Sequence, residues 1–220
     1  MTTEPVTASP GFVGPLAGTF AVQTVVSMAM FGVAVIAPVA APEIGVQAEL
    51  IGTFSAIAYG FGMLAGLMTG ALAGHFGAIR ICQLAMVFVL FGVVALTIST
   101  PLAAIASAVL LGLSYGPVNP ASTEILARVT TPRTRPLVFS AKQTGMPAGA
   151  ALAGAILPLL IVAFDWHVAI VSTGILAIVV AFAIQPLQSQ FAAKPDATRS
   201  VSAKNIIDPL GLVIWPGGKL

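Results

Sequence analysis

The sequence consists of long apolar blocks separated by short polar segments. Within each block the apolar residues run on continuously, without the alternation of a β-strand or the single stripe of a soluble amphipathic helix. A membrane-spanning helix needs roughly 20 such residues. We therefore predict an all-α membrane protein with a six-span bundle over residues 15–187. The predicted spans are Pro15–Val39, Leu50–Ala73, Ile81–Ser99, Leu102–Leu126, Val138–Phe164 and Val168–Leu187.

Composition supports lipid as the solvent and excludes several classes of protein. Hydrophobic residues make up 58% of the chain and charged residues only 7%, whereas a typical soluble domain has roughly a quarter charged residues. The single Cys82 excludes a disulfide framework or a cysteine metal site. No His-Glu-x-x-His motif or paired intramembrane acids are present, and His75 and His167 fall at opposite membrane faces. We therefore expect neither an enzyme nor a protein with a metal or cofactor, and the net charge of +2 is too small for nucleic-acid binding.

The basic residues predict the orientation. All nine Lys and Arg residues fall in the even-numbered loops, at the adjoining helix ends, or in the C-terminal tail. The positive-inside rule places this side in the cytoplasm. We therefore predict a cell (inner) membrane protein with a cytoplasmic N-terminal segment, residues 1–14, and a cytoplasmic tail, residues 188–220. Trp166, at the edge of an outer loop, is expected to be an interfacial anchor, and the apolar segment Ile206–Trp215 is either interfacial or the stub of something longer.

Small residues recur at helical spacing in the second and fifth spans. Residues four apart share one helix face, and small residues let membrane helices approach closely. We interpret these glycines as packing residues, although such a face also suits a sliding or dimerising surface. The glycines are Gly62, Gly66, Gly70 and Gly74 in the second span, and Gly145 and Gly149 in the fifth.

This recurrence indicates that spans one to three and four to six are two three-helix repeats. Because three is odd, the repeats are inverted in the membrane, which is typical of transporters. The first helix of each repeat carries the most polar residues, and these are the candidates for lining a substrate cavity: Gln23, Thr24 and Ser27, then Ser114, Tyr115 and Asn119. Pro117 and Pro120 are expected to kink the fourth span and to act in gating. Alternatively, Ser114 and Asn119 only satisfy the carbonyls that the prolines free.

Two charged residues fall within predicted spans, Glu124 and Lys142. Charge inside a bilayer is costly and is a hint of function. Both side chains could instead reach the cytoplasmic interface by snorkelling, and Glu124 could pair with Arg128, four residues on. The alternative for Lys142 is that it meets an anionic solute together with Gln143 and Thr144.

Three segments carry a resemblance to a known family. The stretch from Gly70 to Arg80 resembles the loop signature between helices two and three of the major facilitator superfamily, roughly G-x-L-a-D-R-x-G-R-R. Gly70, Leu72, Gly77 and Arg80 match it, but Gly74 and His75 replace its acidic and basic residues. Residues 139–158 look like the fifth helix of many bacterial members, and residues 112–120 like the fourth, without its frequent arginine.

The resemblance implies a secondary active transport protein. Family members typically have twelve helices in two halves with the substrate site between them, so the chain corresponds to an N-terminal half, its tail resembling the start of the central loop. By analogy, the glycine face of the second span would pack against the other half. The predicted function is transport of a small solute by a gradient-driven carrier, or a truncated half of one. The alternative is an inactive fragment or an oligomeric scaffold or channel subunit. The expected partners are lipid, an unidentified solute, and a second copy or a separate C-terminal half.

Overall fold

A computed structural model describes residues 11–191. The regular elements in this range are all helical. In chain order they are α1 (Val13–Ile44), the 3-10 helix η1 (Ala48–Leu50), α2 (Ile51–Phe76), α3 (Ala78–Leu96), α4 (Pro101–Val129), α5 (Arg135–Gln143), α6 (Gly145–Ala163), α7 (Trp166–Ala183), η2 (Gln185–Leu187) and α8 (Gln188–Phe191). Residues 1–10 and 192–220, including the segment Ile206–Trp215, lie outside the described range.

Six segments of the described range are long and apolar enough to cross a membrane, which confirms the predicted number of spans. The helices extend beyond several of the apolar blocks from which they were predicted. For example, α1 continues past Val39 to Ile44, and α4 past Leu126 to Val129. Helical geometry satisfies the backbone beyond the hydrocarbon region too, so a helix need not end where its apolar residues do.

The fifth span differs from the prediction, because it is two helices rather than one. α5 ends at Gln143 and α6 begins at Gly145. Pro147 has no N–H group to donate to the carbonyl of Gln143, four residues earlier, so the hydrogen-bond ladder is interrupted there. The Thr144 N–H still donates to Ser140 at 3.3 Å, and the Thr144 carbonyl accepts from Ala148 at 3.0 Å. The result is a local break in a continuous membrane crossing.

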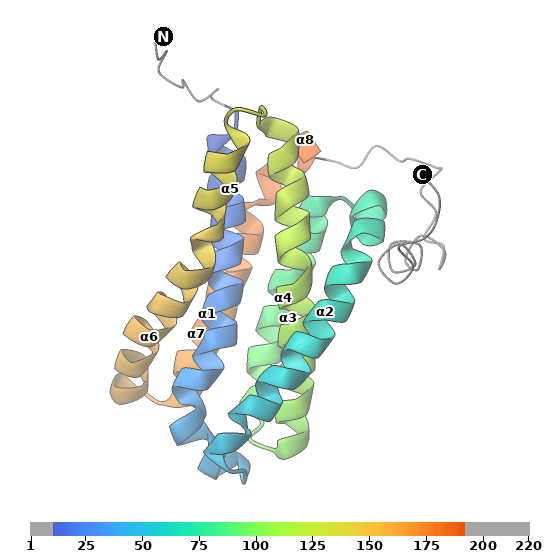
Figure 1. Cartoon of the computed structure of the whole chain (residues 1–220). Coiled ribbons are helices and arrows are strands. Elements are labelled where there is room, and N and C mark those ends of the chain that lie inside the picture. Colours follow the sequence, from blue (N-terminus) through green and yellow to red (C-terminus); the bar gives the residue numbers. More distant parts are fainter. Residues whose placement is uncertain (1–10, 192–220) are drawn as a thin grey trace.

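The spans form two layers (Figure 1). We call α6, α1, α4 and α2 the front layer, in which α1 packs on α6 and α4, and α4 packs on α2. Behind them α7 packs on α1 and α3 packs on α4, while α3 and α7 contact each other. The main core lies among these helices and includes Ile36, Met86, Val89, Leu111 and Ile170, which are all at most 1% exposed.

Contacts between the helices show the two inverted three-helix repeats. The second span of the first repeat, α2, packs on α4, which begins the second repeat. Reciprocally, the second span of the second repeat, continued by α6, packs on α1, which begins the first. The third helices, α3 and α7, pack on each other. Reciprocal contacts of this kind are expected when two repeats are related by a two-fold axis in the membrane plane.

The described basic residues gather at one end of the bundle. The start of α1, the α2–α3 and α4–α5 connections and α8 all lie at this end (Figure 1). Arg128 pairs with Glu124 at 2.5 Å, which confirms that predicted ion pair. The basic residues of the described range at this end are Arg80, Arg128, Arg133, Arg135 and Lys142.

Candidate functional site

Glycines bring the backbones of α2 and α4 into direct contact. A Cβ atom at Gly62 would lie 3.2 Å from the carbonyl oxygen of Gly112, and one at Gly66 would lie 3.5 Å from that of Gly116. A Cβ atom at Gly116 would overlap the carbonyl oxygen of Gly62. The expectation that this face packs against a missing half is therefore wrong for Gly62 and Gly66, since α4 of the same chain covers them. Gly70 has no atom within 4 Å of its Cβ position.

A second glycine contact joins α6 to α1. A Cβ atom at Gly145 would lie 3.0 Å from the carbonyl oxygen of Phe20, and one at Gly149 would lie 2.8 Å from both the Met28 nitrogen and the Ser27 Cβ. This contact is the counterpart of the α2–α4 contact in the inverted repeat. Small residues suit both contacts, because lipid provides no hydrophobic drive for helix association. Close van der Waals packing has to hold the helices together instead.

The α6 contact covers the polar residues of α1 that were candidates for lining a cavity. Gln23, Thr24 and Ser27 are at most 8% exposed. The Thr24 hydroxyl donates to the Phe20 carbonyl at 2.8 Å, whereas Gln23 Oε1 and Ser27 Oγ have no hydrogen-bond partner among the described residues. These three side chains lie inside the half-bundle rather than at an open surface.

Helix α4 runs through Pro117 and Pro120 without interruption. The prolines leave the carbonyls of Leu113 and Gly116 without their usual donors. Ser114 is buried and donates to Leu111 instead, at 2.7 Å. Ser114 therefore does not satisfy a carbonyl freed by proline, contrary to that alternative.

Tyr115 of α4 contacts residues of two other helices of the front layer, α6 and α2. Its hydroxyl donates to the sulfur of Met146 at 3.4 Å. Its half-buried ring meets the exposed ring of Tyr59 edge to face, with 5.7 Å between the ring centroids. Tyr115 thus connects α2, α4 and α6, while its ring stays partly accessible.

Lys142 is the most unusual residue of the bundle. It is only 1% exposed, so it does not snorkel to the cytoplasmic interface as one alternative predicted. Its Nζ donates to the side-chain oxygen of Asn119 at 2.5 Å and lies 3.5 Å from the Asn119 carbonyl. Asn119 is exposed on α4. Lys142 and Asn119 are thus brought together across two spans that lie far apart in the sequence.

The other two predicted partners of Lys142 lie at the break between α5 and α6. Gln143 and Thr144 are both exposed. The Thr144 hydroxyl donates to Ala141 at 2.7 Å, and no hydrogen bond within the described range joins the side chain of either residue to that of Lys142. We define the polar set as Tyr115, Asn119, Lys142, Gln143 and Thr144, the candidates that remain at or directly beneath the surface.

The loop signature has its own local geometry. Gly77 between α2 and α3 has φ 87°, a backbone conformation that favours glycine. Beside it is a small pocket of about 130 Å³ lined by His75, Phe76, Gly77, Ile79, Arg80, Gln188 and Phe191. In the amide orientation that satisfies both atoms, the Gln188 oxygen accepts from Arg80 Nε at 2.7 Å. Gly74 is half-buried near the end of α2.

Sequence reasoning missed a polar network at the opposite end of the bundle. Trp166 Nε1 donates to Glu43 at 2.7 Å, His167 Nε2 lies 3.2 Å from the same carboxylate, and the Ser99 hydroxyl donates to it at 3.1 Å. Trp166 is only 5% exposed, so the prediction of an interfacial anchor is wrong. The network joins the end of α1 to the α3–α4 and α6–α7 connections. The only signal in the sequence was that each of these outer segments holds a polar side chain.

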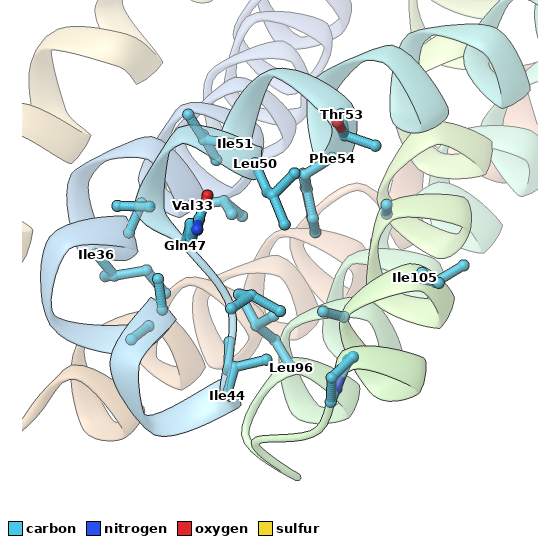
Figure 2. Close-up of a pocket in the computed structure, with 18 of the residues that line it drawn as sticks. Val33, Ile36, Ile44, Gln47, Leu50, Ile51, Thr53, Phe54, Leu96 and Ile105 are labelled. Carbon is cyan, nitrogen blue, oxygen red and sulfur yellow. The ribbon is translucent and has the colours of Figure 1, made fainter.

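Figure 2 shows an apolar cavity of about 240 Å³ at the same end, between α1, α2 and α4. Ile36, Leu50, Phe54 and Ile105 are among its lining residues, and Gln47 and Thr53 supply its polar side chains. A polar solute needs several convergent hydrogen-bonding groups. This cavity does not provide them, and the polar set remains the better candidate site. No cluster that could hold a metal ion occurs among the described residues.

Comparison with known proteins agrees with this architecture. A family model described as the Major Facilitator Superfamily matches residues 19–214. No curated protein matches the chain. Among solved structures the chain is similar to the peptide transporter POT in complex with sulfate, with a TM-score of 0.68 and 19% identity over 91% of this chain and 44% of that chain. A POT variant in complex with alafosfalin gives a TM-score of 0.70 and 19% identity over 96% and 46%.

At 19% identity the structural likeness shows the fold alone, and the chain spans less than half the length of these transporters. The family model is the stronger finding, because it covers most of the 220 residues. Its members are secondary transporters of the multi-pass membrane type and not enzymes. With six spans in two inverted repeats over residues 11–191, this chain has the fold of one half of such a transporter and belongs to the Major Facilitator Superfamily.

Proposed function

We propose that the chain is one half of a gradient-driven carrier and contributes the polar set to the binding of a small solute. The observation that carries the proposal is the reciprocal packing of two inverted repeats within a member of a transporter family. In carriers of this architecture, transport results from rocking of one bundle against another around a fixed site. The polar set lies on α4, α5 and the α5–α6 break, and it places hydrogen-bonding groups at or directly beneath the surface.

The proposal requires a second bundle, and we infer that it covers the front layer. The two spans at the edges of this layer are the least buried. Only 11% of the apolar stretch in the α2 span and 17% of that in the α5–α6 span is buried, against 39% to 67% for the other four. On α2, Met63 and Leu67 are 65% and 51% exposed. The second bundle is either another copy of this chain or a separate C-terminal half.

Native mass spectrometry in lipid nanodiscs, combined with cysteine crosslinking, tests this assembly. Gly66 is a poor crosslinking position because α4 covers it. We would use Leu67→Cys in a Cys82→Ser background, with Phe91→Cys on α3 as the control of similar exposure, 57% against 51%. A dimer crosslinked through Leu67→Cys but not through Phe91→Cys supports pairing through the front layer. Equal crosslinking at both positions would indicate unspecific association.

Transport itself is tested by reconstituting the chain in liposomes, with an imposed proton gradient and a panel of radiolabelled small solutes. Gradient-dependent uptake that is lost in an Asn119→Ala variant supports the carrier proposal. A discrete monomer without uptake of any solute would refute carrier activity for the chain by itself. It would favour the alternative of an inactive fragment.

A further inference from the structure

Lys142 is a buried ionisable residue without an acidic partner among the described residues. Its ammonium group is buried, yet its hydrogen bonds go to the neutral oxygens of Asn119. It forms no ion pair within residues 11–191, whereas the other intramembrane charge, Glu124, pairs with Arg128. Burying a charge is costly unless it is paired. A buried ammonium without an anionic partner is therefore a candidate for binding a charged ligand.

The elements around Lys142 are poor in charge. Helix α3 contains no acid, and its thiol, Cys82, is fully buried. Helix α4 supplies Asn119, and its one acid, Glu124, lies at a partly exposed position with Arg128. Helix α6 contains no ionisable side chain, and the one acid of α1, Glu43, belongs to the network at the opposite end of the bundle. No acid on these elements thus forms an ion pair with Lys142 in the part of the chain that the structure describes.

The same geometry offers a route to the ammonium. Asn119, which accepts its hydrogen bond, is exposed and separates Lys142 from the surface. An ammonium group has three donors, and an ionised acceptor makes a stronger hydrogen bond than a neutral amide. An anion that displaced the Asn119 side chain would therefore replace its oxygen as the acceptor on Nζ. The break between α5 and α6 lies close to Lys142, since α5 ends at Gln143 and α6 begins at Gly145.

We propose that Lys142 and Asn119 form a subsite for the carboxylate of a small, singly charged organic acid. The remaining members of the polar set, Tyr115, Gln143 and Thr144, are neutral and suit the uncharged part of such a solute. One ammonium group with neutral hydrogen-bonding partners matches one negative charge. This inference rests on the proposed carrier function and names the class of its solute.

The test measures the thermal stability of the purified full chain in phosphatidylcholine nanodiscs, a zwitterionic lipid that offers no anionic headgroup in competition. Cys82 is the sole cysteine and is buried, so a thiol-reactive dye reports unfolding. The probes are acetate, lactate and benzoate, each compared with its neutral amide at the same concentration. A ligand that binds only the folded state raises the midpoint. We expect each carboxylate that binds to raise it by about 3 °C or more at saturation.

Three variants locate the effect. Lys142→Met removes the charge and should abolish the difference between carboxylate and amide, whereas Arg133→Gln, an exposed charge at the same end of the bundle, should retain it. Asn119→Asp supplies a carboxylate from within the chain. It should raise the midpoint without any probe and abolish the response to added carboxylates. Because this last arm adds an interaction instead of removing one, it remains informative if Lys142→Met does not fold.

The outcomes separate this inference from the carrier proposal. Equal carboxylate shifts in the wild type and in Lys142→Met would overturn the subsite, as would a lower midpoint for Asn119→Asp. Equal shifts from carboxylates and amides would show solute binding without recognition of charge, so the carboxylate class would fall while the carrier proposal survived. No shift from any carboxylate in the wild type would also refute the subsite.

Discussion

The contact between α2 and α4 allows a sharp test of how this bundle is held together. Gly116→Ala adds one methyl group where no space exists, because the new Cβ would overlap the Gly62 carbonyl oxygen and lie 2.9 Å from the Gly62 Cα. Both obstructing atoms belong to the backbone, so no side-chain rotation relieves the clash. The two helices must separate or shift along each other. Either movement weakens the close packing that stabilises membrane helix pairs.

The magnitude follows from two opposing effects. Gly→Ala within a helix stabilises it by up to about 1 kcal/mol, and inserting a methyl group into a packed core costs about 1–3 kcal/mol. Because the new methyl group would clash with backbone atoms, the cost of Gly116→Ala lies at or above the upper end of that range. We therefore expect a net loss of about 2 kcal/mol, which lowers the ratio of folded to unfolded protein roughly 30-fold.

The matched control is Gly60→Ala on α2, since no atom lies within 4 Å of its Cβ position. It should leave the stability unchanged or raise it slightly. Both variants can be measured by unfolding in mixed micelles with increasing sodium dodecyl sulfate, followed by helical circular dichroism. If Gly116→Ala proved as stable as Gly60→Ala, the described contact between α2 and α4 would be refuted.

Three other predictions concern separate regions. Gly77→Ala should lower the free energy of unfolding by about 1–3 kcal/mol, because φ is 87° there and alanine is strained in that conformation. The same detergent titration measures this loss, and an unchanged midpoint would contradict the positive φ at Gly77. Trp166→Phe and Glu43→Gln should each lower the thermal midpoint, and the double variant should lose less than the sum, because the two residues share one hydrogen bond; strict additivity would argue against that bond. Arg133→Cys in a Cys82→Ser background should react with a membrane-impermeant maleimide in inside-out vesicles and not in intact cells, as the positive-inside rule requires. Labelling in intact cells would show that the predicted orientation is wrong.

The features of this protein that depend on its lipid surroundings could be predicted from the sequence. The number of spans follows from apolar blocks long enough to cross hydrocarbon, and the segregation of basic residues predicts which end faces the cytoplasm. The repeat was also visible, because the glycine spacing recurs in spans two and five. Each of these signals is read along the chain and needs no knowledge of what a given helix face contacts.

The tertiary structure decided what each face contacts. Gly62 and Gly66 look the same in the sequence whether they meet α4 or another bundle, and only the approach of α4 settles the question. Lys142 lies near the inner end of its span, where the sequence favoured snorkelling. The packing of α5 against α1 and α4 instead turns it inward to Asn119. Trp166 was expected to meet lipid, yet Glu43 reaches it from a helix more than a hundred positions earlier. Hydropathy is a property of single residues and their neighbours in sequence, whereas the rotation and partners of a helix result from contacts between distant segments.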